Sequence, residues 1–454
     1  MAGFLCATSA RHERVISRRS ELRSSAQDGD FRPVTLQTEQ PIFEAGFCAG
    51  GVLAFADVLL PLQADGKKVW RMVEVKSSTS VKDYHEDDCA IQAFVARAAG
   101  VPLHAIALAH IDSSWVYPGG NDYHGLLVEV DLTDEAFARA DEVASWIEKA
   151  AATAASQAPP AIKTGAKCSQ PYACGFFDHC NQDNPQPEFP VHWLPRIGQR
   201  AVAYAEQGVI DLRDVPDDQL NDKQRRVKAH TVAGTTYFDA VGAAATLAQY
   251  SLPAYFLDFE SIQFAVPIWK GTRPYQQNVF QFSLHTLGSE GQLEHTGHLD
   301  LSGDDPSEGL AKALVAACCT HGPVYVYNRG FERGRLHELA ERFPALGAPL
   351  LAINERLVDL LPIAREHYYH PSQQGSWSLK KVLPAVVPAL SYDALDGVAD
   401  GGMAMEVYHE AIHTDTRAER KAQIEEQLLV YCKLDTYALV RLWQVFARRT
   451  DLKL

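Results

Sequence analysis

The run AYFLDFESI, residues 254–262, is apolar and of strand length, yet it carries two carboxylates. Side chains alternate across a strand, so Asp258 and Glu260 lie on the same face. Two carboxylates this close raise each other's pKa unless a cation lies between them. No basic residue is close to them in the sequence. The run therefore predicts a strand of a β-sheet that presents two metal ligands.

Two later segments supply further acids. VYVYNRGFERGRL places Glu332 where a strand gives way to a helix, and LLVYCKLDTYALV places Tyr431 and Asp435 one helical turn apart, so that both face one site. Taken singly, an acid at a helix start is explained equally well by compensation of the helix dipole. Taken together with the paired acids of the strand, these residues predict a site for two metal ions.

The order of these motifs resembles the DEDD family of 3′–5′ exonucleases, in its tyrosine subtype. The matching motifs are Asp-x-Glu on a first strand, Asn-x-x-Phe followed by an acid, and Tyr-x-x-x-Asp. The resemblance implies a ribonuclease H-like fold, with Tyr431 orienting the attacking water. It implies that two Mg²⁺ or Mn²⁺ ions are held by Asp258, Glu260, Glu332 and Asp435. Glu332 stands where the family usually has aspartate, and Asp359 in RLVDLL matches a downstream acid with a structural role.

The first half of the chain contains a second constellation of polar residues. Asp57 interrupts the apolar run LAFADVLL, and an Asp-Gly turn leads to VEVKSS, in which Glu74 and Lys76 share one face. A hairpin would bring Asp57 to the same edge, and Gln92 lies on the helix predicted next, on one face with Tyr84 and Asp88. Two carboxylates and a lysine suit metal-assisted phosphodiester hydrolysis. The alternative is ordinary charged decoration of an edge strand.

The segments ADVLL, EVKSS and CAIQAF resemble the motifs of the PD-(D/E)XK nuclease superfamily, closest to its RecB-like branch, which includes the CRISPR-associated exonucleases. The resemblance implies that Asp57 and Glu74 are metal ligands. It further implies that Lys76 is the catalytic lysine and that Gln92 assists on the active-site helix.

Three clustered cysteines follow, in the spacing C-x5-C-x5-C of CSQPYACGFFDHC. Zinc sites favour closer pairs, whereas three thiols among proline and aromatic residues suit an iron–sulfur cluster. The alternative is three ordinary cysteines. Several RecB-like exonucleases bind a [4Fe–4S] cluster, so the resemblance implies that Cys168, Cys174 and Cys180 are ligands. The upstream fourth ligand would be Cys6.

The domain organisation follows from alternating strand and helix patterns on either side of a polar, proline-rich stretch at 181–193. We expect an α/β protein with a divergent or shortened N-terminal segment at 1–39 and a restriction-endonuclease-like PD-(D/E)XK domain at 40–185. A mainly helical connector follows at 186–250, and a ribonuclease H-like exonuclease domain with a central mixed sheet at 251–454. A helix is predicted over 354–367. The segments FLDFESI, PYQQNVFQFSLH, GSWSLKKVLPA and YCKLDTYAL resemble an uncharacterised bacterial family, catalogued as a domain of unknown function, in which an exonuclease-like half follows a RecB-like half.

The charge and composition limit the function classes. A net charge of −15 argues against binding a polyanion through bulk charge, but not against an enzyme whose acids hold metal ions. The basic segments KQRRVK and SLKK are each explained by a solvated helix face. With no long apolar run and no signal peptide, we expect a cytoplasmic protein without a membrane partner.

The expected function is a metal-dependent nuclease acting on single-stranded or duplex ends of DNA or RNA. The alternatives are a catalytically impaired nucleic-acid-binding or regulatory protein, and a redox sensor built on the cluster.

Overall fold

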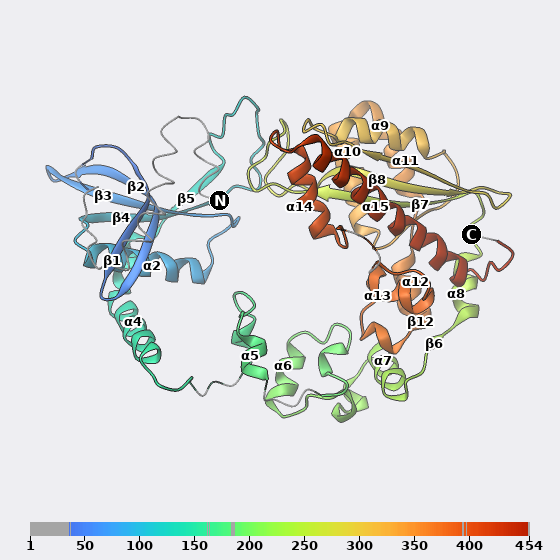
Figure 1. Cartoon of the computed structure of the whole chain (residues 1–454), viewed down its shortest axis with the longest axis horizontal. Coiled ribbons are helices and arrows are strands. Elements are labelled where there is room, and N and C mark those ends of the chain that lie inside the picture. Colours follow the sequence, from blue (N-terminus) through green and yellow to red (C-terminus); the bar gives the residue numbers. More distant parts are fainter. Residues whose placement is uncertain are drawn as a thin grey trace. The chain divides into compact units, whose positions relative to one another are not determined.

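The computed structural model describes residues 36, 38–160, 162, 164–182, 187–392, 395 and 397–452. These residues form two compact units. The first contains the described residues up to Cys180 together with Phe264–Gln276, and the second contains the remainder. Each unit is built on a five-stranded mixed sheet, so the expected α/β class is confirmed (Figure 1).

The first sheet has the order β1-β2-β3-β4-β5. Its strands are β1 (Ile42–Ala49), β2 (Val52–Ala64), β3 (Lys67–Lys76), β4 (Leu103–Ile111) and β5 (Leu127–Asp131). The predicted Asp-Gly turn joins β2 to β3, and both Asp65 and Gly66 adopt the positive φ that a tight hairpin turn requires. β4 runs parallel to β3 because helix α2 (Asp83–Ala98) crosses between them.

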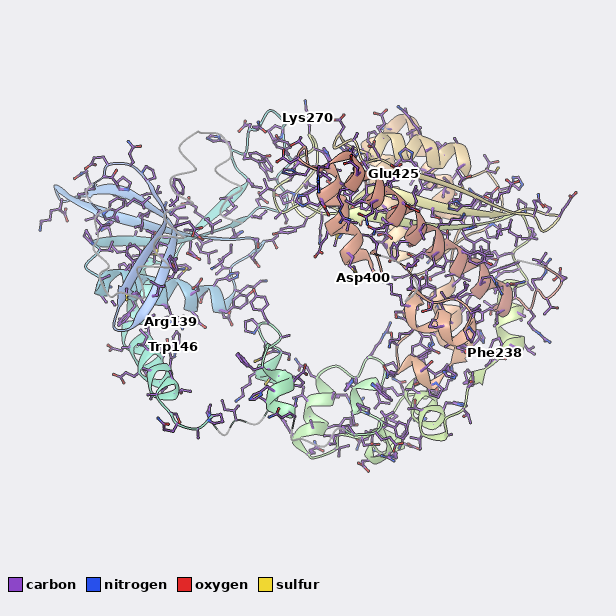
Figure 2. The ribbon with its side chains drawn as sticks, viewed as in Figure 1. Arg139, Trp146, Phe238, Lys270, Asp400 and Glu425 are labelled. Atoms are coloured by element: carbon purple, nitrogen blue, oxygen red, sulfur yellow. The ribbon has the colours of Figure 1, made fainter. Side chains whose placement is uncertain are left out.

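The core of the first unit lies between this sheet and α2. Trp70 and Met72 of β3 are fully buried, as are Cys89 and Ala93 of the helix. The helices α3 (Thr133–Ala138) and α4 (Ala140–Ala154) follow β5. Figure 2 labels Arg139 and Trp146, whose guanidinium carbon and ring centroid lie 5.2 Å apart. The cysteine segment then forms η2 (Ala166–Cys168) and α5 (Phe177–Asn181).

One segment of the first unit comes from the second half of the sequence. Phe264–Gln276 packs against the loop that follows β4, where Tyr117 exchanges two backbone hydrogen bonds with Gly271 and Thr272. The hydroxyl of Tyr275 donates to the carbonyl of Ser77, the residue after Lys76. The first unit thus includes a loop that the sequence pattern placed in the other half.

The second sheet has the order β11-β10-β7-β8-β9. Its strands are β7 (Ala254–Ile262), β8 (Asn278–Leu287), β9 (Leu293–Leu299), β10 (Val324–Val326) and β11 (Leu357–Asp359). The first three form an antiparallel meander, and β10 pairs in parallel with both β7 and β11. The long strands β7 and β8 are buried along almost their whole length.

Helices cover both faces of this sheet. They are α9 (Ser307–Ala317), α10 (Gly330–Arg342), α11 (Pro344–Glu355), α12 (Leu360–His367), α13 (Leu379–Val386), α14 (Gly401–Ile412) and α15 (Ala418–Phe446). On one face Tyr255, Leu257 and Phe259 of β7 share a core with α9, α10 and α11. The alternate residues of β7 face α15, where the rings of Phe256 and Trp443 meet at 5.8 Å. None of the helices in the described part of the chain is both long and apolar enough to span a membrane.

The helix predicted over 354–367 is wrong as a single element. α11 ends at Glu355, the strand β11 occupies Leu357–Asp359, and α12 begins at Leu360. Leu357 and Val358 pair in parallel with β10 and bury both side chains, which favours a strand at this point over a continuous helix. The following helix is capped by Asp359, which accepts a hydrogen bond from the Leu361 amide at 2.9 Å.

The helical connector belongs to the second unit and has a small core of its own. Its elements are η3 (Val191–Trp193), α6 (Gln199–Glu206), η4 (Leu212–Asp214), η5 (Asp217–Gln219), α7 (Asp222–Ala233), β6 (Tyr237–Phe238) and α8 (Ala240–Leu247). β6 pairs with β12 (Tyr368–Tyr369), after which η6 (Pro371–Gln373) leads toward α13. Thr231 of α7 also meets the hydroxyl of Tyr369 at 2.6 Å. The connector is therefore hydrogen-bonded to the chain around α12.

At this junction Gly375 leaves no room for a side chain. Gly375 has φ +75°, and a Cβ there would lie 1.6 Å from the carbonyl oxygen of Trp193. Gly375→Ala is expected to cost about 2–5 kcal/mol, from the left-handed backbone and the steric clash. The melting temperature should fall by roughly 5–15 °C in a thermal unfolding experiment. Gly334→Ala, on α10 with nothing within 4 Å of its Cβ, is the matched control and should be neutral or slightly stabilising. Equal melting of the two variants would contradict this packing.

Candidate active sites

The two acids of β7 lie side by side beneath α15. One carboxylate oxygen from each, and the sulfur of Cys432, all lie within 4.8 Å of one another. Within the described ranges, this is the only such group of three potential metal-ligand atoms from His, Cys, Asp or Glu. Glu260 is buried and Asp258 partly buried. The strand thus presents both acids to one site, on the face opposite the apolar core.

The position of α15 over this site is fixed by hydrogen bonds to β8. Gln281 donates from Nε2 to the carbonyl of Leu428 at 2.9 Å, and Ser283 Oγ lies 2.6 Å from Thr436 Oγ1. In the sheet register, the two β8 residues lie opposite the two acids of β7. The neighbour of Thr436, Asp435, is 6% exposed and lies close enough to raise the pKa of both acids.

Two tyrosines and a lysine surround Asp435. The hydroxyl of Tyr392 donates to Asp435 Oδ1 at 2.5 Å, and Tyr431 also hydrogen-bonds to this carboxylate. Lys380 Nζ lies 5.5 Å from the centroid of each tyrosine ring, and its charge lowers the pKa of both Asp435 and Glu260. Of these residues the sequence motifs identify only Tyr431. Lys380 lies in the SLKK segment, which the sequence pattern explained as a solvated helix face.

Glu332 enters the site from the first turn of α10 and is 2% exposed. Its approach is set by Asp359, which accepts hydrogen bonds from the amides of Asn328 and Arg329 at 3.0 Å each. Asn328 has φ +73°, so the chain turns sharply between β10 and α10. Asp359 thereby anchors the turn while it caps α12. Glu332 Oε2 is buried without a hydrogen-bond partner among the described residues.

Burial dominates the electrostatics of this cluster. It raises the pKa of Glu260 and of Glu332 to about 8 each, and that of Asp435 to about 6. The pKa of Asp258 is raised well above its ordinary value, by burial and then by the charges of the other three acids. Four ionised carboxylates are therefore unfavourable together without a compensating cation. The positive charges that lower their pKa values are Lys380, which acts on Glu260 and Asp435, and Arg335, which acts on Glu332.

The donor set fits hard divalent cations. Mg²⁺ and Mn²⁺ prefer carboxylate oxygens, and the buried, unpartnered Oε2 of Glu332 is one that a cation would satisfy. Burial raises the pKa of the Cys432 thiol well above its usual value, so this sulfur stays protonated and is a poor ligand. The structure brings together all four acids that the motifs single out, with Tyr431 beside them.

The raised pKa values predict a particular stability profile. The folded metal-free protein binds protons at Glu260 and Glu332 that the unfolded chain releases at its ordinary pKa, so stability should fall as pH rises from about 5 to about 8. Mn²⁺ requires the deprotonated acids, so it should raise the melting temperature more at about pH 8 than at about pH 5. At one hundred times its Kd, the gain is about 2.7 kcal/mol, or roughly 5–10 °C. Thermal unfolding at both pH values, with Mn²⁺ or EDTA, checks this. Equal shifts at the two pH values would contradict it.

The first unit contains a smaller acidic site at the β2–β3 hairpin. Asp57 and Glu74 follow the register that pairs Val58 with Val73, so they lie opposite each other on one face. Asp57 Oδ2 accepts a hydrogen bond from the Val75 amide at 2.8 Å. Glu74 is 5% exposed, and burial, followed by the charge of Asp57, raises its pKa to about 7.

Lys76 connects this pair to helix α2. Its Nζ donates to Glu74 Oε1 at 2.7 Å and to Asp88 Oδ2 at 2.5 Å. Burial alone would lower the pKa of Lys76, but hydrogen bonds to Asp88 and Glu74 raise it above its ordinary value. Asp88 was not among the predicted site residues, although its helical spacing with Gln92 already placed it on the correct face.

Two buried oxygens of this site have no partner among the described residues, Glu74 Oε2 and Gln92 Oε1. Gln92 is 7% exposed and lies one helical turn after Asp88 on α2. Buried oxygens without a hydrogen-bond partner are the ligand atoms that a hydrated divalent ion would use. The residues present therefore fit a cation, with fewer protein carboxylates than the site on β7.

The clustered cysteines lie at the surface of the first unit. Cys174 and Cys180 are exposed and Cys168 is partly exposed. Their sulfurs do not form a group within 4.8 Å, so they are not held as closely as a single zinc ion with bonds of about 2.3 Å requires. Tyr172, between them, meets Tyr84 of α2 edge-on at 5.7 Å. Cys6, the expected fourth ligand, lies outside the described residues.

A comparison with protein families gives one match. Residues 255–378 match a family described as a domain of unknown function (DUF2779). The matched span includes Asp258, Glu260 and Glu332 but stops before Tyr431 and Asp435. No curated protein and no solved structure matches the chain. The match supports relatedness to an uncharacterised family over the sheet of the second unit, and assigns no activity.

Proposed function

We propose that the protein is a divalent-metal-dependent nuclease with two hydrolytic sites, one in each unit. The observation that carries the proposal is the convergence of Asp258, Glu260, Glu332 and Asp435 on one buried site with a tyrosine at its edge. Burying four acids around so little positive charge is explained by a function that needs them ionised around cations.

The topologies of both units support this proposal. The order β9-β8-β7-β10-β11, with an antiparallel meander followed by two parallel strands, is the arrangement expected of a ribonuclease H-like fold. In the first unit, an antiparallel meander is followed by a crossing helix and a parallel strand, as expected of a PD-(D/E)XK fold. In each unit two of the site acids lie on interior strands of the sheet, Asp57 and Glu74 on β2 and β3, and Asp258 and Glu260 on β7.

Mg²⁺ or Mn²⁺ at these acids would supply Lewis-acid activation and neutralise charge on a phosphodiester. The surrounding residues have separate roles. Burial raises the pKa of Tyr431 far above its usual value, so its hydroxyl orients a water by hydrogen bonding and does not act as a base. Lys380 offers a positive charge next to the acids, where a phosphate would lie. Lys76 stays protonated at neutral pH because its pKa is raised, and therefore stabilises negative charge in the transition state.

The cysteine segment supports a second part of the proposal, a [4Fe–4S] cluster in the first unit held by Cys168, Cys174 and Cys180. Exposed sulfurs in a segment that contacts α2 at Tyr84 favour this assignment over three buried structural cysteines. This cluster assignment is tested by the iron content and the visible absorption of anaerobically purified protein. Protein that contains no iron would contradict the assignment.

One observation favours a non-catalytic alternative. Glu332 has a longer side chain than the aspartate usual at this position, which changes the spacing available to two ions. A cleavage assay separates the alternatives: the nuclease proposal requires cleavage of labelled nucleic acid in Mg²⁺ or Mn²⁺ that EDTA abolishes and added metal restores. Binding of nucleic acid without any cleavage would instead support the alternative.

A further inference from the structure

The second unit contains a large cavity whose lining comes from the connector and from the chain around α12. It has a volume of about 1310 Å³. This exceeds the roughly 300–1,000 Å³ of ordinary small-molecule pockets, so it has room for an extended ligand. Arg196 and Lys223 line it from the connector, and Arg365, Asn328 and Ser378 line it from the other side.

The charges of the cavity are unevenly paired. Lys223 and Arg226 share a single acid, with Glu366 oxygens 3.0 Å and 3.6 Å from their nitrogens. Arg196 and Arg365 form no ion pair or side-chain hydrogen bond with any residue in the described ranges. A chain with a net charge of −15 thus keeps two unpaired guanidinium groups in one cavity. Guanidinium groups bind phosphate oxygens through paired hydrogen bonds.

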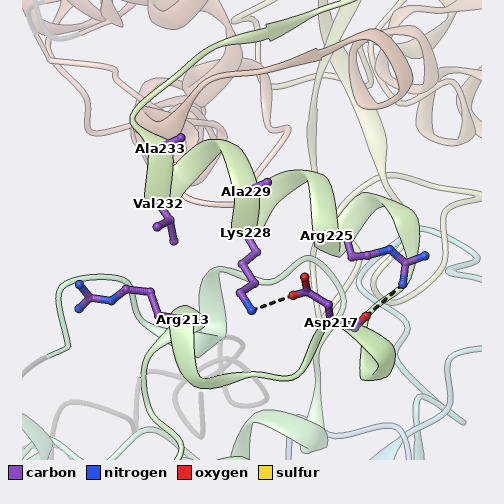
Figure 3. Close-up of a pocket in the computed structure, with 7 residues that line it drawn as sticks. All are labelled: Arg213, Asp217, Arg225, Lys228, Ala229, Val232 and Ala233. Carbon is purple, nitrogen blue, oxygen red and sulfur yellow. Dashed lines mark hydrogen bonds and ion pairs between the residues drawn. The ribbon is translucent and has the colours of Figure 1, made fainter.

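A second pocket, on the other side of α7, shows the contrast (Figure 3). It has a volume of about 350 Å³ and is lined by Arg213, Arg225 and Lys228, among others. Each of these cationic side chains already forms an ion pair with an aspartate. Lys228 Nζ lies 2.8 Å from Asp217 Oδ1, and Arg213 and Arg225 pair with Asp211 and Asp222 at 2.9 Å and 2.5 Å. The two pockets therefore differ in available positive charge, although basic residues line both.

The larger cavity adjoins the acidic site along the chain on two sides. Asn328, which lines it, belongs to the turn that leads into α10 and Glu332. Ser378 and Leu379 line it at the start of α13, and the next residue, Lys380, lies beside Tyr431 at the acids. A nucleic-acid strand bound in the cavity would therefore contact the turn that leads to Glu332 and the start of the helix that carries Lys380.

We propose that this cavity binds the phosphodiester backbone of single-stranded nucleic acid and directs its end to the acids of β7. This inference rests on the proposed nuclease function and gives the connector a role in holding the substrate. Arg196 and Arg365 bind phosphates, and the polar side chains of Asn328 and Ser378 contribute further hydrogen bonds. Specificity for base sequence is not expected, because the unpaired groups are suited to phosphate and not to base edges.

The test compares two double variants, each of which removes two positive charges, one pair from the large cavity and the other pair from the smaller pocket. Arg196→Gln with Arg365→Gln empties the large cavity of its unpaired cations, and Arg225→Gln with Lys228→Gln is the matched control. Binding is measured in EDTA, by fluorescence anisotropy, with labelled single-stranded DNA and RNA of about 12 nucleotides. The cavity variant should bind about a hundredfold more weakly, about tenfold for each residue. The slope of log K against log salt should fall by about 0.7 for each lost phosphate contact.

The outcomes separate this inference from the proposed function. If the wild type cleaves and both double variants bind equally well, the proposed role of the cavity is contradicted and the nuclease proposal is unaffected. Weaker binding by the cavity variant alone supports the inference, and a preference between the DNA and RNA probes then identifies the sugar. A wild type that neither cleaves nor binds either probe contradicts both. Thermal unfolding of each variant excludes loss of fold as the cause.

Discussion

Replacing Asp258 with asparagine is expected to abolish cleavage by the second unit, by about a thousandfold or more, while stabilising the metal-free protein. The loss follows because a carboxylate ligand is worth several kcal/mol of transition-state stabilisation, and each 1.36 kcal/mol is tenfold in rate. The stabilisation follows because burial and three neighbouring acids raise the pKa of Asp258 well above its usual value. At about pH 8 the folded chain must otherwise ionise these acids together.

The two effects of this variant are measured separately. Initial rates of cleavage in Mn²⁺ give the loss of activity, and thermal unfolding in EDTA at about pH 8 gives the rise in melting temperature. Glu425→Gln, an exposed acid on α15 labelled in Figure 2, removes the same charge and should change neither quantity. A lower melting temperature for Asp258→Asn would show that this carboxylate stabilises the fold and would contradict the metal-site account.

Replacing Lys76 with alanine is expected to remove the activity of the first unit, by about a hundredfold to a thousandfold. Lys76 supplies the only positive charge bonded to Glu74 and Asp88 among the described residues, at 2.7 Å and 2.5 Å. Without it, the developing charge on a phosphate would be uncompensated, and the two acids would repel each other across the space left. Activity that belongs to the β7 site should be unchanged, because that site is built from residues of the second unit.

The control for this variant is Lys67→Ala, an exposed lysine at the start of the same strand. Cleavage assays on a labelled single strand, a duplex and an RNA should show one activity lost with Lys76→Ala and none lost with Lys67→Ala. If Lys67→Ala lowers activity as much, the effect reflects general charge and not the position of Lys76.

The fold could be anticipated where the sequence pattern is long. The runs that became β2, β3, β7 and β8 alternate or are continuously apolar over many residues, and the Asp-Gly turn predicted the hairpin of β2 and β3. β11 escaped prediction because Leu357–Asp359 is short, and only its pairing with β10 makes it a strand. The placement of Phe264–Gln276 in the first unit also depends on distant contacts, which a local pattern does not encode.

The candidate sites could likewise be predicted only where a local sequence pattern carries their residues. Asp57 and Glu74 could be paired from the hairpin, and Tyr431 and Asp435 from helical spacing. Cys432 follows Tyr431 but is not itself a motif residue, and only the packing of α15 over β7 brings it close to Asp258 and Glu260. Tyr392 and Lys380 belong to none of the sequence motifs that carry the predicted site residues, so tertiary structure alone brings them to Asp435.

The central claim is that the chain has two separate metal-dependent hydrolytic sites. Its most direct test is cleavage of a labelled single strand, a duplex and an RNA by the wild type, Lys76→Ala, Asp258→Asn and the double variant, in Mn²⁺. The account predicts that each single variant loses one activity and keeps the other, and that the double variant cuts nothing. Cleavage of all three substrates by both single variants at the wild-type rate would contradict it.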